Sequence, residues 1–323
     1  MQAYLRKASA VAFIVTPVFV APAFAEPFRL ERKFDLAAGD RFVLASGVGG
    51  VALRGVPGRQ ASIVVTSDRK DIAERYDFRF EQEAGRLRMT VERRQKGFLS
   101  WWFQSFRGGV HIAIEVPRAT PVDLHTSGGV IDLSALEATV KASSSGGGVK
   151  VADVHGDVTL SSSGGAVEVR LVQGAVRLDS SGGGVQAESV EGTVYADTSG
   201  GSVTLKTVSG DIEASSSGGG VDIQGAGGRV KAGSSGGPVR VLFAAGNSKG
   251  GDLDSSGGGV VATLDSAAGL DVDASSSGGS VDCDLPVTIQ GRAQRTSLHG
   301  KLNGGGAVLR LRSSGGGITI NPR

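Results

Sequence analysis

A Ser-Gly-Gly signature that recurs at constant spacing is the feature that most constrains the fold of this chain. Between residues 127 and 237 it returns every eighteen residues without a slip, and it is found again after steps of 21, 21 and 37 residues. The signature serines are Ser127, Ser145, Ser163, Ser181, Ser199, Ser217, Ser235, Ser256, Ser277 and Ser314. A fixed period of this size is typical of stacked repeats, in which each unit contacts mainly its neighbours.

Apolar residues within each repeat recur at steps of two, which is the periodicity of a β-strand. In the repeat that starts at Ser145 they are Val149, Val151, Val154, Val158 and Leu160. Each repeat therefore predicts two short strands joined by corners. One corner is the signature, and the other carries a glycine eleven residues after the signature serine. Glycine suits such bends because it reaches positive φ without a Cβ clash.

One such coil cannot bury its own apolar face, so the coils must stack. Stacking at ~4.8 Å pairs each backbone with its neighbours and creates one aliphatic core. We therefore predict an all-β fold, a β-solenoid of about ten coils and roughly 50 Å in length. The residue before the signature serine is also small and hydroxylated, at Ser162, Ser180, Thr198 and Ser216. The alternation points these hydroxyls inward, which predicts a hydrogen-bonded Ser/Thr ladder at the corner.

Residues 1–25 have the pattern of a secretory signal. Arg6 and Lys7 precede a short apolar stretch, and Ala23-Phe24-Ala25 fits the cleavage rule of small residues. Without the two charges the remaining chain carries as many basic as acidic residues, which argues against nucleic acid as a partner. No later apolar run is long enough for a membrane helix. We expect an exported protein, located in the periplasm or outside the cell.

Residues 26–125 form a second compositional region, richer in charge than the repeats, and we expect them to be an atypical N-terminal β cap. The solenoid region is then 126–323. Alternating segments predict strands at 41–44, 50–54, 62–66, 77–81, 86–92 and 110–116. Residues 76–83 and 86–93 look like a hairpin. A cap is expected because a bare solenoid end exposes core and strand edges.

These motifs together resemble the bacterial putative-adhesin β-strand-repeat family, a domain of unknown function related to the head domains of putative autotransporter adhesins. The resemblance rests on Phe34-Asp35-Leu36 followed by Gly39, Gly49-Gly50-Val51, Gly85-Arg86-Leu87, the Ile112–Pro117 strand, and the Gly-Asp-Val and Gly-Asp-Ile motifs at Gly156–Val158 and Gly210–Ile212. It spans most of the chain after residue 25. It implies an exported domain like a right-handed β-helix with a proposed role in adhesion, and it supplies no catalytic residues.

An aromatic segment at Phe98–Phe106 is the sharpest local departure from the composition around it. It holds both tryptophans, Trp101 and Trp102, together with Phe103 and Phe106, and Arg107 follows. Such a segment could bind a lipid headgroup layer, a glycan or an envelope protein, because tryptophan and arginine favour membrane interfaces and binding hot spots. Alternatively, these rings plug the end or side of the solenoid.

Carboxylates late in the repeats are a second candidate site. Asp252 and Asp254 flank an inward Leu253, and Asp271 and Asp273 flank an inward Val272. The repeat places the two pairs on neighbouring coils, with Asp252 and Asp273 in one column. Carboxylates at strand spacing repel unless a cation joins them, and Ca²⁺ prefers oxygen ligands. A solvated acidic face is the alternative, because water and salt shield such charges.

The spacing loosens after Ser235. Three extra residues per coil, around 244–251 and 265–270, are expected to form surface loops. Residues 296–300 look like a degenerate signature coil between Ser277 and Ser314. The chain ends in a strand at 318–320, stopped by Pro322, which suits a sheet edge.

No reaction can be derived from these residues. The only cysteine, Cys283, excludes an internal disulfide, and the four histidines have no metal-ligand spacing. A serine repeated ten times is structural, and no cofactor motif is present. We expect a non-enzymatic interaction or structural module of the cell envelope. The alternatives are a carbohydrate-active lyase or hydrolase that uses the late Asp face, and a scaffold that polymerises end to end.

Overall fold

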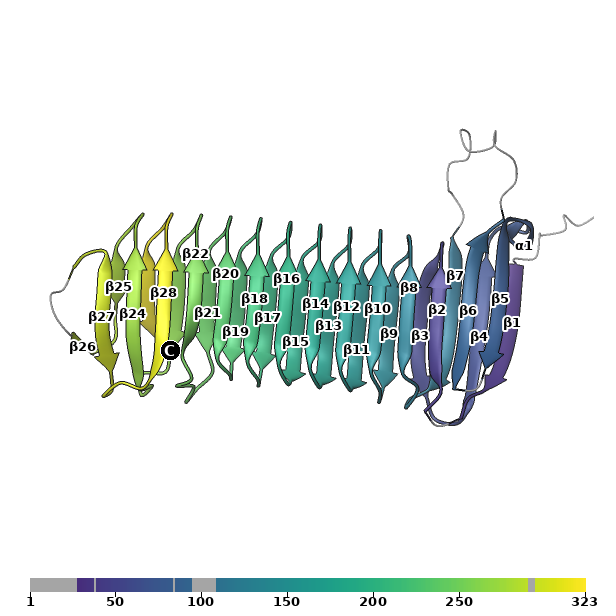
Figure 1. The fold of residues 1–323 in the computed structure, drawn as a ribbon, viewed down its shortest axis with the longest axis horizontal. Coiled ribbons are helices and arrows are strands. Elements are labelled where there is room, and N and C mark those ends of the chain that lie inside the picture. The colour runs from purple at the N-terminus through teal and green to yellow at the C-terminus, as the bar shows by residue number, and fades with distance from the viewer. Residues whose placement is uncertain (1–27, 38, 84, 95–108, 290–293) are drawn as a thin grey trace, which may run out of the picture.

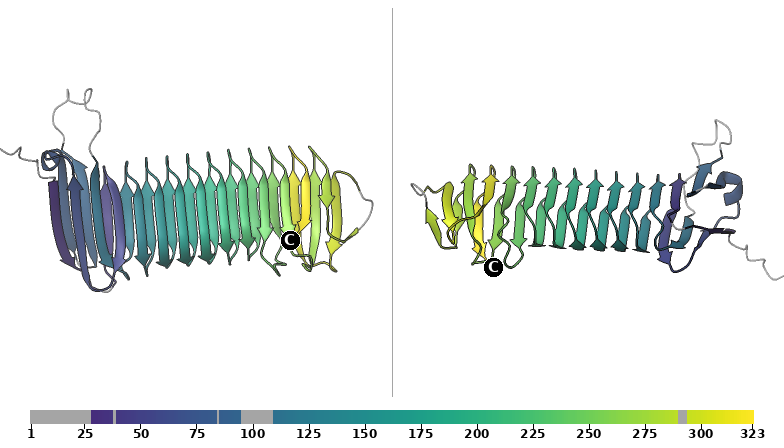
Figure 2. Two further views of the ribbon diagram at one scale, coloured as in Figure 1. Left: turned by 180° about the vertical axis from the view of Figure 1, so that it is seen from behind. Right: turned by 60° about the horizontal axis from the view of Figure 1, so that its bottom comes forward.

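The computed structural model describes residues 28–37, 39–83, 85–94, 109–289 and 294–323, and they form a long rod (Figure 1). Its layers are two β-sheets that face each other along the rod. Figure 2 shows this stacking from behind and from below. Within the described ranges the one helix is α1 (Ile72–Arg75), beside the first strands. No helix among the described residues is long and apolar enough to cross a membrane.

The first sheet has 14 strands. In spatial order they are β1 (Phe28–Asp35), β4 (Gln60–Ser67), β7 (Val110–Pro117), β3 (Gly50–Val56), β9 (Ile131–Leu136), β11 (Val149–His155), β13 (Val167–Gln173), β15 (Val185–Glu191), β17 (Val203–Val208), β19 (Val221–Ala226), β21 (Val239–Phe243), β23 (Val260–Leu264), β29 (Ile318–Pro322) and β25 (Val281–Cys283).

The second sheet has 15 strands. Their order, from the opposite end of the rod, is β26 (Val287–Ile289), β27 (Ser297–Leu302), β24 (Leu270–Ser276), β28 (Ala307–Ser313), β22 (Gly251–Ser255), β20 (Val230–Ser234), β18 (Ile212–Ser216), β16 (Val194–Thr198), β14 (Val176–Ser180), β12 (Val158–Ser162), β10 (Val140–Ser144), β8 (Val122–Thr126), β2 (Arg41–Ser46), β6 (Arg86–Arg93) and β5 (Tyr76–Glu83).

Successive coils pair in parallel and in register, with Cα partners eighteen residues apart, as Val149 with Val167 and Val158 with Val176. The inward-facing valines, leucines and isoleucines of both sheets are buried between them as one continuous core. The predicted β-solenoid with two strands per repeat is confirmed, and so is its aliphatic interior. The insertions around 244–251 and 265–270 lie mainly in loops, as expected.

The predicted hydroxyl ladder is also confirmed, and its hydrogen bonds run through the backbone. Ser162 Oγ donates to the carbonyl of Gly147 in the preceding coil (2.8 Å) and accepts from the amide of Gly165 in its own coil (2.9 Å). Ser180 then donates to the Gly165 carbonyl (3.1 Å), so hydroxyls and glycine peptides alternate along the corner. These hydroxyls satisfy backbone groups that no strand partner reaches.

The second glycine of the signature is required by close approach of backbones. A Cβ on Gly165 would lie 2.3–2.6 Å from main-chain atoms of Gly147 and Gly148 in the preceding coil. At the other corner the same close approach occurs, since a Cβ on Gly156 would lie 2.6 Å from the Ala138 carbonyl oxygen, and positive φ, the reason expected from the sequence, is added at Gly156 (+155°) and Gly174 (+151°). Close approach of backbones therefore requires glycine at both corners, and positive φ is a second reason at Gly156 and Gly174.

A left-handed residue recurs eight positions after the signature serine, and the sequence pattern does not reveal it. Five successive coils fill this position with residues other than glycine, and the sixth has Gly225 at φ +74°. The five are Ala135, Asp153, Leu171, Ser189 and Thr207, with φ between 54° and 59°. Each lies at a point that the strand pairing skips, so the chain bulges outward there.

The N-terminal strands continue the two sheets and then end them. β2 and β3 pair in parallel with the repeat strands β8 and β9, so strands on both sides of residue 126 share the same sheets. The expected hairpin of 76–83 with 86–93 is confirmed as β5 and β6. β1, which the sequence pattern missed, pairs antiparallel with β4. The division into a cap and a solenoid region stays a prediction.

The C-terminal coils depart from chain order. β28 lies between β22 and β24, and β29 lies between β23 and β25. Residues 296–300 do not form a signature coil, because most of them belong to β27, which pairs antiparallel with β24. The expectation that Asp252 and Asp273 lie on neighbouring coils is also wrong, since β28 separates their strands.

Candidate interaction surface

The sequence-predicted binding residues Trp101, Trp102, Phe103, Phe106 and Arg107 lie outside the described residues. Their role in binding stays a prediction, and so does the alternative that they plug the solenoid.

The late Asp residues lie at the outer face of the second sheet, where arginines of the inserted strand meet them. Asp252 accepts hydrogen bonds from Arg229 (2.8 Å) and Arg310 (2.9 Å). Asp273 lies 3.4 Å from Arg312 and 3.5 Å from Arg310. Arg310 thus bridges the two carboxylates that the sequence places in one column. This surface is an ion-pair network, in which arginines compensate the Asp252 and Asp273 carboxylates without a metal ion.

The remaining two carboxylates are less constrained. Asp271 accepts a hydrogen bond from the Gly306 amide (3.3 Å). Partial desolvation raises the pKa of the Asp254 carboxyl, and the neighbouring Asp252 adds to that shift. Across the described ranges, no group of three or more His, Cys, Asp or Glu side chains is arranged to hold a metal ion. Calcium binding by Asp252, Asp254, Asp271 and Asp273 stays a prediction, and at Asp252 and Asp273 the arginines offset the charge repulsion that motivated it.

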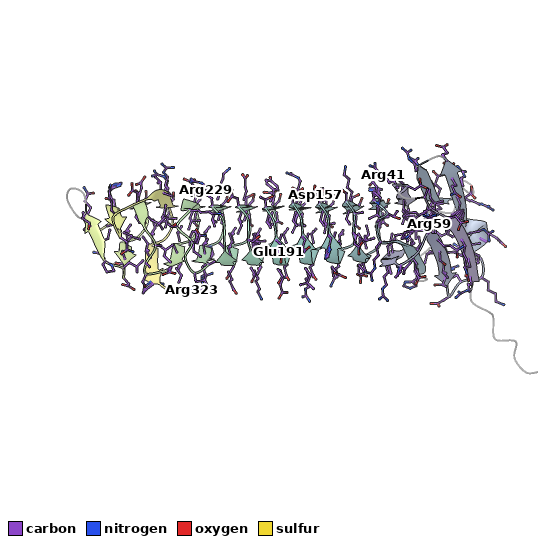
Figure 3. The ribbon with its side chains drawn as sticks, turned by 90° about the horizontal axis from the view of Figure 1, so that it is seen from below. Arg41, Arg59, Asp157, Glu191, Arg229 and Arg323 are labelled. Atoms are coloured by element: carbon purple, nitrogen blue, oxygen red, sulfur yellow. The ribbon has the colours of Figure 1, made fainter. Side chains whose placement is uncertain are left out.

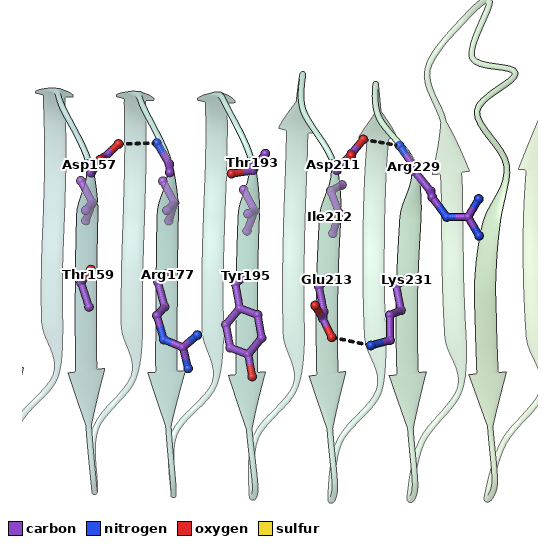
Figure 4. Close-up of a pocket in the computed structure, with 14 residues that line it drawn as sticks. Asp157, Thr159, Arg177, Thr193, Tyr195, Asp211, Ile212, Glu213, Arg229 and Lys231 are labelled. Carbon is purple, nitrogen blue, oxygen red and sulfur yellow. Dashed lines mark hydrogen bonds and ion pairs between the residues drawn. The ribbon is translucent and has the colours of Figure 1, made fainter.

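A groove on the outer face of the second sheet is the surface with the most varied chemistry. It encloses about 590 Å³ and crosses strands β12, β14, β16, β18 and β20 (Figure 4). Since in-register stacking repeats each outward position once per coil, its walls are two columns of side chains. One column is Asp157, Ala175, Thr193, Asp211 and Arg229, and the other is Thr159, Arg177, Tyr195, Glu213 and Lys231.

An aromatic–cation pair stands at the middle of this groove. The Arg177 guanidinium lies 4.0 Å from the centroid of the Tyr195 ring, and its Nε is 3.0 Å from Asp179. Such a cation–π contact is worth about 0.5–1 kcal/mol at an exposed site. The pair presents a flat, half-buried ring and a planar donor group side by side, which are the groups that dominate binding hot spots.

The charged side chains around the pair are held in place by neighbours. Glu213 and Lys231 form an ion pair of 2.6 Å across adjacent coils, which raises the pKa of the lysine. The Asp211 carboxylate accepts from the backbone amide of Arg229 (2.8 Å), as the Asp157 carboxylate does from Ala175 (2.9 Å). The groove therefore has alternating charges, several of which are compensated by a neighbour on the next coil.

The first sheet carries a second groove, of about 680 Å³, along the left-handed bulges. Its lining includes Leu171, which is 61% exposed, and His155 and Glu191 on neighbouring coils. Figure 3 shows Glu191 projecting from one face of the rod and Asp157 and Arg229 from the opposite face. The two grooves thus lie back to back across the core.

The sequence contains one indication of the first groove, a rare aromatic residue, which is easily overlooked among the regular repeats. Tyr195 is the only aromatic residue of 127–323 besides Phe243, which is buried in the core. Counting outward positions would have aligned Arg177 with Tyr195, since they are one repeat apart. That the two side chains stack, however, depends on rotamers, which no periodicity specifies.

Comparison with solved structures finds long alignments at low similarity. A "putative adhesin" from Parabacteroides distasonis is 12% identical, with a TM-score of 0.48, and the match covers 91% of this chain and 97% of that one. A "putative lipid binding protein" from the same species is 13% identical, with a TM-score of 0.41 and coverage of 90% and 96%. A "putative adhesin" from Bacteroides fragilis is 13% identical, with a TM-score of 0.38, and the match covers 92% of this chain and 97% of that one. At these scores the likenesses carry no functional argument.

Comparison by sequence is more decisive. No curated protein matches the chain. The sequence model of one family, described as Toastrack DUF4097, matches residues 57–321, which is most of the chain and includes every repeat. The match agrees with the resemblance to an adhesin-like domain of unknown function that the motifs indicate. The chain therefore belongs to the Toastrack DUF4097 family.

Proposed function

We propose that this protein is an exported, non-enzymatic interaction module of the cell envelope, and that it binds its partner through the groove on the second sheet. The observation that carries the proposal is the Arg177–Tyr195 pair, which places a half-buried aromatic ring beside a guanidinium in a groove lined by charged and small side chains. The leader-like pattern of residues 1–25 supports export. A location in the periplasm or outside the cell follows from it.

The stack makes the groove a preorganised surface. Its strands are paired on both sides, and their inward residues are fully buried. Binding therefore requires little ordering of the protein backbone, so the loss of conformational entropy on binding is small. A shallow groove that crosses five strands suits an extended partner, such as a glycan chain or a peptide segment of an envelope protein.

Capture from envelope extract tests this proposal. We expect the Arg177→Ala/Tyr195→Ala double variant to lose most of the material that the wild-type protein retains, because truncated hot-spot residues typically cost about 2 kcal/mol or more. Arg240→Ala, on the outer face of the first sheet and away from both grooves, is the control and should retain it. Equal capture by all three proteins would sink the groove as the binding surface.

The aromatic segment is a second candidate for the same role, because it combines Trp101 and Trp102 with Arg107. We expect a Trp101→Ser/Trp102→Ser variant to lose binding to vesicles that contain anionic lipid, if this segment binds a membrane surface. A variant that binds normally but melts at lower temperature would identify the segment as structural.

A further inference from the structure

The N-terminal end of the rod consists of two strand edges beside which the described residues place no further strand. β1 ends the first sheet and pairs only with β4, and β5 ends the second sheet and pairs only with β6. Both strands are eight residues long. At the other end, by contrast, the last strands β25 and β26 have three residues each. Long unpaired edges are templates for pairing with another chain.

The inward positions of these two strands are mainly apolar, with Arg32 and Gln82 as the polar exceptions. Phe28 stacks on Phe78 at 5.9 Å between ring centroids, and Phe34 stacks on Phe80 at 5.6 Å. All four rings, and Leu30 beside them, pack against the core but are only partly buried. Equivalent inward positions in the repeats are fully buried because a further coil covers them. The end of the core therefore lacks one covering layer.

The outward charges of the two strands are complementary. β1 presents Arg29, Glu31, Lys33 and Asp35 in order, and β5 presents Asp77, Arg79, Glu81 and Glu83. Aligned in this order, the first three positions oppose unlike charges and only the last opposes like charges. β1 aligned antiparallel with a copy of itself would oppose unlike charges at all four positions, but the same arrangement sets β5 against β5. The outward positions of β5 carry three acidic residues and one basic residue, so two copies of β5 repel, whereas β1 has as many basic as acidic residues there. The pattern thus favours β1 beside β5.

We infer that two copies of this chain join head to head, with β1 of each copy pairing in parallel with β5 of the other. β1 and β5 run in the same direction (Figure 1), and the two ring contacts, 28 with 78 and 34 with 80, are centred on residues 31 and 79, which places these two residues level. A two-fold axis parallel to the strands then brings β1 beside β5 at these levels. Both sheets become continuous through the dimer, and the half-buried rings of the two copies cover one another.

The neighbours predicted across each junction are specific. Arg29 lies beside Asp77 of the partner subunit, Glu31 beside Arg79 of the partner subunit, and Lys33 beside Glu81 of the partner subunit. Within one chain Arg29 and Arg79 already pair with Glu31 and Asp77 at 3.1 and 2.9 Å. These pairs are exposed and weak, so they can be shared with the partner at little cost. Symmetry makes every junction occur twice.

Sedimentation over a range of concentrations tests the dimer with the exported form of the protein. We expect a monomer–dimer equilibrium that Glu31→Arg weakens by roughly tenfold or more, because it opposes like charges at both junctions. Adding Arg79→Glu should restore the wild-type dissociation constant, since the reversed charges again attract. Arg240→Glu, on the middle of the first sheet, is the control and should change nothing.

A cross-link provides a second measurement that does not depend on charge. In a Cys283→Ser background, Lys33→Cys together with Glu81→Cys should form disulfide-linked dimers on mild oxidation, because the two positions are adjacent only between copies. Within one chain they lie on the outer faces of opposite sheets. A monomer at every concentration, a dimer indifferent to Glu31→Arg, or a failure to cross-link while the protein sediments as a dimer each overturns the proposal.

Discussion

The regular coils and the C-terminal coils are built from the same repeat and differ in how chain order relates to spatial order. From β8 to β22 each strand of the second sheet pairs with the equivalent strand of the next repeat. Beyond β22 the partner of Leu253 is Leu311, 58 residues on, and the partner of Ala274 is also Leu311. The last repeat of the sequence is thus inserted before the one that precedes it.

The hydroxyl ladder shows what this difference teaches. It passes from Ser255 to Ser313 and then to Ser276, in spatial order and not in chain order, with the same bonds to glycine peptides. Every coil presents the same edge to the next, so the stack accepts any coil that carries the signature. Which coil it accepts has to be decided by other contacts.

The largest effect is expected at the second glycine of the signature, where the backbones of successive coils approach closely in both the regular and the C-terminal coils. Gly165→Val should lower the free energy of unfolding by about 3 kcal/mol or more, because its Cβ would meet rigid backbone of the preceding coil. Denaturant unfolding measures this. Gly233→Val is the control, since a Cβ there meets nothing within 4 Å. Similar losses in both variants would contradict the packing reason.

A second comparison removes one rung of the ladder in each region. Ser180→Ala leaves the Gly165 carbonyl and the Gly183 amide without their partner, and Ser313→Ala does the same at Gly258 and Gly316. Each should cost about 1–3 kcal/mol, as buried unsatisfied groups do. Equal losses in thermal unfolding would confirm that the ladder is indifferent to chain order, whereas a negligible loss at Ser313 would break that equivalence.

A smaller effect of opposite sign is expected at the left-handed bulges of the regular coils. Thr207 is β-branched and has φ +54°, while the next coil has glycine at this position. Thr207→Gly should raise the free energy of unfolding by about 0.5–1 kcal/mol, since the relieved strain exceeds the entropy cost of glycine. Denaturant midpoints would show it. Thr204→Gly, in the same strand without positive φ, should instead destabilise.

The smallest expected effect concerns the ion pairs that hold the inserted strand. Asp252→Asn removes the charge shared by Arg229 and Arg310, which tie β28 to the regular stack. A loss of about 0.5 kcal/mol is expected, and it should shrink at high salt because these pairs are partly exposed. Asp179→Asn, whose arginine is on the same strand, is the control and should lose less. Thermal melting at two salt concentrations would separate the variants.

Much of the fold could be predicted because the information is local. Alternation at Val149–Leu160 predicts strands, and the constant period predicts that equivalent residues stack. The candidate groove could not be predicted to the same degree, since the contact of Arg177 with Tyr195 depends on side-chain rotamers. The prediction for the late Asp residues failed in its geometry, because it assumed that neighbouring repeats in the sequence are neighbouring coils.

The amino-acid sequence by itself determined the coil: two short strands, an aliphatic interior, inward hydroxyls and glycines where backbones meet. It did so because period-two patterning and the absence of a Cβ act within one repeat and the next. Tertiary structure alone decided the order of the last coils, the left-handed bulges and the pairing of Arg310 with both Asp252 and Asp273. All coil edges are nearly equivalent in hydrogen bonding, so long-range side-chain contacts and the antiparallel pairing of β24 with β27 had to select the arrangement.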